Sequence, residues 1–379
     1  MGFAVLGVAF AVASTARAAD PELRFPRAAQ QANLLDDPER RARPCLCQFG
    51  VGLRSGVPGF QIEQLLPPAA LGHHSYGVPS SDEVNGQVYT CDAGFIDSTH
   101  LRAGADWTAH LALLFDRTRD GGTVEFAPEG GGVRLVIRRA THPLSAEDLL
   151  RLAQRAAYER LLWHEVMSWY YHPPEHLFSE QQSTFSPEDA VSDFVGTEVG
   201  RRALARVEAF GVPYEDAVDS VLDDRLTELG VVATADDTRQ NFLAVDRNED
   251  GLVTGAAWYD SDVIFWDQTY LRKRDVSVFG KVAAWRVPAG AEAGCDRSAR
   301  AYVGRVPRVT ERGTALTDLY EWQFTPERRF FRTAEDRPGD PRFLHDPLPT
   351  TVTNLTLPAA VDQVAAELRA ALGPTFDQP

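Results

Sequence analysis

The feature that most constrains this fold is a long helical segment in the middle of the chain. From Ser145 to about Tyr171, apolar residues recur at the three- and four-residue spacing of a helix. Ser145 and Asp148 resemble a capping box with Asp in place of the usual Glu. Pro173-Pro174 ends the segment, because proline lacks the N–H that a helix interior requires. A helix of this length spans the depth of a small domain, so the rest of the chain must pack around it.

Helix start patterns predict further helices on both sides of this segment. Asp97–Phe115 begins with a capping residue. Ser186-Pro187-Glu188-Asp189 joins a cap, a proline at the first helical position and acids that the helix dipole favours. Gly196 and Gly200 in that second helix suit close packing against a neighbour, and a third helix covers Pro213–Leu229. The middle of the chain is therefore a helical region of three to four helices.

Strand patterns flank this region. Residues 46–95 read as loops and short strands, and two alternating segments around a Gly-rich turn predict a hairpin of Thr123–Phe126 and Val133–Ile137. Later strands are expected at Val263–Trp266, Val276–Phe279, Val282–Val287 and Leu319–Phe324, before a closing helix over Val361–Leu372. We predict an α+β fold with antiparallel strands. An extended arm over residues 19–45 leads into a single domain over residues 46–379, and a sub-boundary near residue 230 is left open.

The N-terminal residues have the pattern of an export leader. A short apolar run, Phe3–Ala13, is followed by Ala16-Arg17-Ala18, which is a small-x-small cleavage pattern. We expect a signal peptide over residues 1–18 and a mature protein that is periplasmic or secreted. No later segment has the roughly 18 apolar residues that a membrane-spanning helix needs, so we expect no membrane span.

The net charge of the chain indicates which classes of partner it can bind. The chain has 54 Asp and Glu residues against 38 Lys and Arg residues, and its net charge is −16. Nucleic-acid binding requires a surplus of positive side chains to neutralise phosphates. We therefore expect no nucleic-acid partner, and the composition does not predict another partner.

The four cysteines, Cys45, Cys47, Cys91 and Cys295, allow disulfides in an exported protein. A bridge between Cys45 and Cys47 would close a very small, strained ring. We expect Cys91 to be oxidised and to pair with Cys45 or Cys47.

The long helix places a carboxylate in unusual surroundings. At about 100° per residue, Glu165 shares a helix face with apolar and aromatic residues, which are Tyr158, Leu161, Leu162 and Trp169. Burial of an unpaired carboxylate costs several kcal/mol or raises its pKa, so a metal, an Arg or a hydrogen-bond network must compensate. His164 precedes Glu165, but the H-E-x-x-H motif of zinc peptidases is not met, because Ser168 stands at the second His position.

A second polar residue lies on an apolar face of the helix that Asp97 caps. His100 shares this face with Gly104, Trp107 and Leu111. Such a histidine is more often a core residue with satisfied hydrogen bonds, but together with Glu165 it also fits a shared polar site. Glu180 and Ser186 lie in the loop after the long helix, and this loop could close over that site.

These blocks resemble an exported proteobacterial family known only as a domain of unknown function. The resemblance covers roughly residues 44 to 290 and rests on several blocks, which are Pro44-Cys45, Tyr89-Thr90-Cys91, Gly94-Phe95-Ile96-Asp97 with His100, Ala105-Asp106-Trp107, Trp163-His164-Glu165, Ser179-Glu180 and Phe185-Ser186-Pro187-Glu188-Asp189. Members of the family tend to have adjacent cysteines after the proline, whereas Leu46 separates Cys45 from Cys47 here. The resemblance implies export and a common fold, and it implies no reaction.

Residues 246–254 resemble part of a calcium loop. Asp246, Asn248, Asp250 and Gly251 match positions one, three, five and six of an EF-hand loop, but Ala257 replaces the bidentate Glu at position twelve. We expect calcium to bind weakly at this loop or not at all, and the alternative is a turn between two strands. Calorimetric titration with calcium tests the loop.

Together these patterns predict an exported metal-dependent hydrolase with a His/carboxylate site. His100, His164 and Glu180 are the expected ligands of zinc or iron, and Glu165 is the expected general base on a metal-bound water, with His164 as its possible proton partner. The alternative is a non-catalytic periplasmic protein that serves binding or structure, with calcium in the 246–254 loop. Glu165 would then pair with an Arg or a backbone N–H.

The leader generates the first prediction. We expect the mature chain to begin at Ala19 or within a few residues of it, because small residues surround that junction. The intact mass of the protein recovered from the periplasm of a bacterial host checks this. Recovery of the whole chain from the cytoplasm would contradict it.

Overall fold

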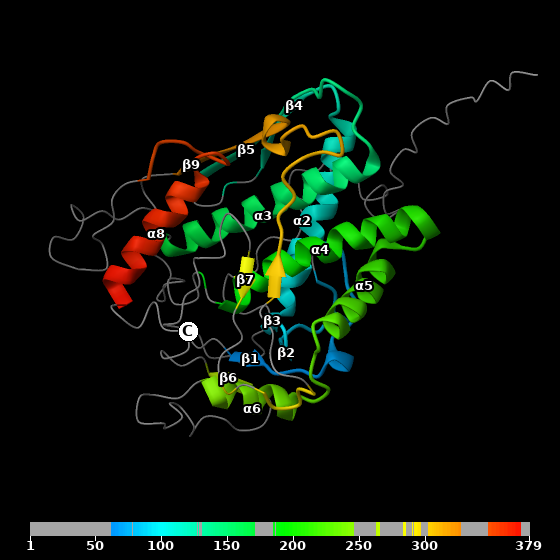
Figure 1. The fold of residues 1–379 in the computed structure, drawn as a ribbon, viewed down its shortest axis with the longest axis vertical. Coiled ribbons are helices and arrows are strands. Elements are labelled where there is room, and N and C mark those ends of the chain that lie inside the picture. Colours follow the sequence, from blue (N-terminus) through cyan, green and yellow to red (C-terminus); the bar gives the residue numbers. More distant parts are fainter. Residues whose placement is uncertain are drawn as a thin grey trace, which may run out of the picture.

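The structure is a computed structural model that describes residues 62–77, 79–126, 128, 131–170, 185, 187–245, 263–265, 283–285, 290, 292–296, 302–326 and 348–372. Its centre consists of three long helices that pack against one another, α2 (Ser98–Arg117), α3 (Ala146–Tyr170) and α4 (Pro187–Phe210), as Figure 1 shows. These three helices agree with the predicted segments. The predicted α+β class is confirmed.

The capping pattern that predicted α3 is present as hydrogen bonds. The Asp148 N–H donates to Ser145 Oγ (3.1 Å), and the Ser145 N–H donates to Asp148 Oδ2 (3.4 Å). Every residue of α3 from Ala156 to Tyr170 is buried. The helix is thus buried on all sides over this part, and not only on the face that contains Glu165.

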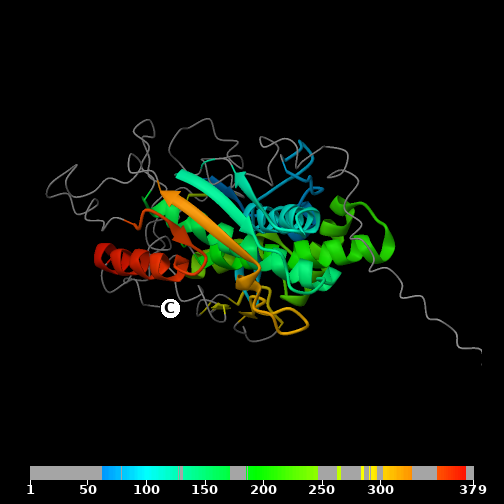
Figure 2. The same cartoon turned by 90° about the horizontal axis from the view of Figure 1, so that it is seen from above.

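An antiparallel sheet covers one side of the helices. Its strand order is β10 (Val352–Thr353), β9 (Tyr320–Pro326), β5 (Gly131–Ile137) and β4 (Gly122–Phe126), and Figure 2 shows its strands running across the helices. Aromatic side chains join the two layers. The Phe324 ring stacks on the Trp163 ring of α3 at 4.5 Å between centroids, and Trp322 Nε1 donates to the Ala156 carbonyl (3.0 Å).

Smaller elements surround this core. The remaining helices are α5 (Tyr214–Glu228), α6 (Ala235–Val245) and α8 (Leu357–Leu372), and short 3₁₀ turns cover Pro68–Ala70 and Leu316–Asp318. Three antiparallel strand pairs complete the described fold: β1 (Ile62–Gln64) with β6 (Val263–Phe265), β2 (Gln87–Thr90) with β3 (Gly94–Asp97), and β7 (Ala283–Trp285) with β8 (Tyr302–Gly304). The sequence did not predict α6, β8 or β10, and the strand predicted at 276–279 lies outside the described residues. Among the helices described, none is long and apolar enough to cross a membrane.

Glycines bring α2 and α4 into backbone contact. A Cβ atom at Gly196 would lie 2.1 Å from the Leu101 carbonyl oxygen, and one at Gly200 would lie 2.6 Å from the Ala105 carbonyl oxygen. From the other helix, a Cβ atom at Gly104 would lie 2.7 Å from the Asp193 carbonyl oxygen. The expected close packing of Gly196 and Gly200 is therefore confirmed, and any larger residue would push the two helices apart.

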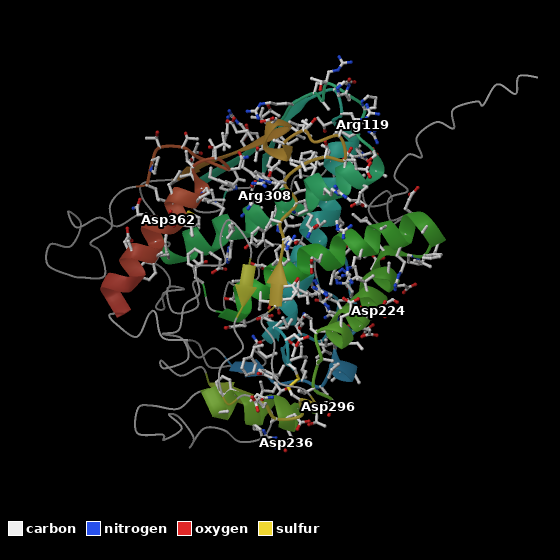
Figure 3. The ribbon with its side chains drawn as sticks, in the orientation of Figure 1. Arg119, Asp224, Asp236, Asp296, Arg308 and Asp362 are labelled. Carbon is white, nitrogen blue, oxygen red and sulfur yellow. A yellow bond between two sulfur atoms is a disulfide. The ribbon has the colours of Figure 1, made fainter. Side chains whose placement is uncertain are left out.

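The disulfide corrects one prediction. Cys91 is oxidised as expected, but it pairs with Cys295 and not with Cys45 or Cys47, which lie outside the described residues. Asn241 of α6 explains the pairing, because its side-chain amide exchanges two hydrogen bonds with the backbone of Ala293 (2.8 Å each) and so fixes the segment that contains Cys295. Figure 3 labels Asp296, the residue that follows Cys295, and so shows where this segment lies.

The glycine contacts predict the effect of one added methyl group. We expect Gly196→Ala to destabilise the protein by about 1–3 kcal/mol or more, because its Cβ would overlap a backbone oxygen that cannot move without shifting α2. Urea unfolding measures this change. Ala205→Ser adds one atom at a half-buried position of the same helix, and it should change stability by no more than about 0.5 kcal/mol. Equal midpoints for Gly196→Ala and the wild type would show that the helices are not held this closely.

Candidate metal centre

The three central helices bring one histidine and four carboxylates together. Asp97 and His100 belong to the start of α2, Glu165 to α3, and Asp189 and Asp193 to α4. Each of these five residues is buried, with at most 8% of its surface exposed. By contrast, the acidic residues labelled in Figure 3 lie on outer elements, for example Asp224 on α5 and Asp362 on α8. Buried charges of this kind require partners or a bound cation.

Local hydrogen bonding places His100 in the site. Asp97 ends β3 and caps α2, and its Oδ1 accepts the N–H groups of Thr99 (2.6 Å) and His100 (3.3 Å). This confirms the predicted cap. His100 therefore lies in the first turn of α2, on the side that faces α4.

His100 lies between the two aspartates of α4. Its Nδ1 is 3.2 Å from Asp193 Oδ1, and its Nε2 is 3.4 Å from Asp189 Oδ1. Asp189 and Asp193 can meet the same imidazole because residues four apart lie on one face of a helix. The two ring nitrogens of His100 thus face two different carboxylates.

Two overlapping groups of side chains could each hold a metal ion. One consists of Asp97, His100 and Asp189, and the other of His100, Glu165 and Asp193. Within each group, one ligand atom from every residue lies within 4.8 Å of the others. Carboxylate oxygen and imidazole nitrogen are donors that divalent transition metals bind.

Glu165 is held in place by a backbone donor. Its Oε2 accepts the N–H of Phe185 at 2.6 Å, and no arginine contacts Glu165 within the part of the chain that the structure describes. Phe185 is fully buried and has a φ of 54°, a left-handed conformation that costs a non-glycine residue about 1 kcal/mol or more. The fold therefore maintains a strained residue whose N–H points at this carboxylate.

Burial dominates the acid–base properties of the site. The pKa of Glu165 is raised to about 7, and desolvation by burial is the largest cause. The Asp193 charge also raises this pKa, while His164, His100 and the Phe185 N–H oppose the rise. Desolvation also raises the pKa of Asp189 well above its usual value, against the opposing charge of His100. Without a metal, the site therefore favours bound protons near neutral pH.

The structure brings some of the predicted site residues together. His100 and Glu165 meet, as expected. His164 belongs to neither metal-holding group, and its Nε2 lies 3.3 Å from Ser168 Oγ one turn along α3, so its predicted role as a ligand stays a prediction. Glu180, Ser186 and the calcium-loop residues Asp246, Asn248 and Asp250 lie outside the described residues.

Three of the carboxylates were missed as candidate ligands. From the sequence, Asp97 was predicted only as a helix cap and Asp189 only as an acid that favours a helix start. Asp193 was not predicted to have a role. The spacing of these residues could have identified them as candidate ligands. Asp97 and His100 are three residues apart, and Asp189 and Asp193 are four apart, so each pair shares one helix face.

The fold and the site define a helix-centred α+β protein with a buried histidine–carboxylate centre. The chain belongs to the DUF4056 family, a family of proteins of unknown function, whose sequence model matches residues 33–283. This range contains all five residues of the centre. Comparisons with the curated proteins and with the solved structures find no match.

The raised pKa of Glu165 predicts a pH dependence of stability. Between about pH 4.5 and pH 7, the folded metal-free protein keeps a proton on Glu165 that the unfolded chain releases. The free energy of unfolding should therefore fall as the pH rises through this window. We expect Glu165→Gln to remove about 3 kcal/mol of this fall, since one pKa unit corresponds to 1.36 kcal/mol.

Urea unfolding of chelator-treated protein at pH 5 and pH 8 measures the effect. Glu125→Gln on β4 is the control, because the Glu125 side chain is 63% exposed. The free energy of unfolding of this variant should fall between pH 5 and pH 8 as that of the wild type does. The same fall in Glu165→Gln as in the wild type would contradict the assignment of the pKa to Glu165.

Proposed function

We propose that the protein is an exported metal-dependent hydrolase in which a divalent ion at His100 activates a water molecule. The observation that supports this proposal is the position of His100 between Asp189 and Asp193, with Asp97 and Glu165 beside them. A bound cation would offset the buried negative charge of this group and would lower the pKa of a water molecule bound to it.

The ligand set follows from the two nitrogens of His100. The shorter contact, from Nδ1 to Asp193, suits an N–H donated to a carboxylate, which fixes the tautomer of a metal-binding histidine. Nε2, which faces Asp189, would then bind the metal together with Asp189 and Asp97.

Glu165 is the proposed general base. The Phe185 N–H holds Oε2 in place, which leaves the other carboxylate oxygen for the water molecule. A carboxylate in this position accepts a proton from the bound water molecule and returns it to a leaving group. His164 stays a candidate proton partner or ligand, and Glu180 a candidate ligand.

The donor atoms bear on the metal. Zinc and iron both accept imidazole and carboxylate ligands, so one imidazole with at least two carboxylates fits either of the two expected metals. The leader and the Cys91–Cys295 disulfide support export, since disulfides persist in oxidising compartments.

One contact favours a second candidate function. The Phe185 N–H satisfies Glu165 in the way expected of a structural carboxylate, so a non-catalytic binding or structural protein is the alternative. Weak calcium binding at residues 246–254 belongs to this alternative.

Two substitutions separate these functions. We expect the wild type to hold one equivalent of iron or zinc and Asp189→Asn to lose it, because a ligand has been removed. We expect Glu165→Gln to keep the metal and to lower kcat on chromogenic esters or phosphoesters by about 10²–10⁴-fold. Metal analysis by mass spectrometry and rate assays measure these outcomes.

Asp224→Asn on α5 is the matched control and should match the wild type in both assays. A wild type that binds neither metal would reject the metal-dependent function. Metal binding with equal rates in Glu165→Gln and the wild type would reject Glu165 as the base.

A further inference from the structure

We infer that Ser192 is a positioning residue that sets the distance between the two halves of the ligand set. The inference rests on the proposed metal site. Ser192 is fully buried on α4, between Asp189 and Asp193 in sequence, and its Oγ accepts the backbone N–H of Asp97 at 2.8 Å. One hydrogen bond therefore joins the segment that holds Asp97 and His100 to the helix turn that holds Asp189 and Asp193.

The orientation of the Ser192 hydroxyl is fixed. Its proton is donated to the Glu188 carbonyl oxygen one turn earlier in α4, so a lone pair faces the Asp97 N–H. That N–H belongs to the residue that caps α2, and the bonds of helix α2 do not use it. If Ser192 lost its oxygen, the Asp97 N–H would be buried without this acceptor.

The hydrogen bond from Asp97 to Ser192 lies where the distance between the proposed ligands of α2 and α4 is set. Gly104 packs against the Asp193 carbonyl and Gly196 against the Leu101 carbonyl, so these glycines set the spacing of the two helix backbones, whereas Ser192 acts at the junction of β3 and α2. Asp97 in turn holds the first turn of α2 through Thr99 and His100. A shift of Asp97 would therefore move both its own carboxylate and the His100 ring relative to Asp189. Outer residues that orient metal ligands typically change metal affinity by about 10–100-fold.

Ser98 provides a matched control. It follows Asp97 directly, it is 1% exposed, and its Oγ also accepts a backbone N–H, that of Gly86 (2.9 Å). That bond holds the preceding loop and contacts no carboxylate of the site. Ser98→Ala and Ser192→Ala therefore remove the same kind of bond at neighbouring, equally buried positions.

The experiment is calorimetric titration of the metal-free full-length proteins with Co²⁺, with thermal unfolding of the same samples. We expect Ser192→Ala to raise the Kd for Co²⁺ by about 10–100-fold and Ser98→Ala to leave it within about threefold. The two variants should lower the Tm of the metal-free protein by similar amounts. Ser192→Cys keeps the side-chain volume with a weak acceptor, and it should repeat the loss of affinity if Ser192→Ala does not fold.

The outcomes distinguish the inference from the proposed function. No binding of Co²⁺ by the wild type would reject the metal site, and the role of Ser192 would fall with it. Binding by the wild type with equal Kd values in the Ser192 and Ser98 variants would overturn the role of Ser192 and leave the metal site intact.

Discussion

The contact of the α2 and α4 backbones is the constraint on which the site depends. Gly196 and Gly200 leave no side chain between the helices, so short side chains on one helix reach the other. His100 can then meet both Asp189 and Asp193, although an aspartate extends only a short distance from its backbone. A wider spacing would open room for water, and the carboxylates would lose the burial that makes their chemistry distinctive.

The same burial opposes stability. Four carboxylates with one imidazole between them are costly in an apolar interior, and the left-handed Phe185 adds strain at the same place. The aromatic layer between α3 and the sheet, which includes Trp163 and Phe324, supplies compensating burial. Local costs of this kind, offset elsewhere in the fold, are typical of sites kept for function.

Local patterns predicted the described helices other than α6, because caps and proline stops act within a few residues. The Ser145 capping box is an example, and the face of Glu165 followed from periodicity alone. The carboxylates that contact His100 were harder to predict, because Asp189 has the same sequence context whether it favours a helix start or belongs to a buried site. The Cys91 pairing depends on Asn241 and Ala293, which come close only after α6 has packed. No local sequence pattern could therefore predict which cysteine pairs with Cys91.

The Cys91–Cys295 bridge makes a covalent ring of the residues between its cysteines, which are 204 positions apart. All five residues of the buried histidine–carboxylate centre belong to this ring. In chain-entropy terms, a ring of this size removes about 5 kcal/mol of freedom from the unfolded chain. The donor side chains of an unfolded molecule therefore stay at a raised effective concentration around one another. A protease cut within the ring would leave both fragments in one molecule, so the centre could reassemble without a second-order encounter.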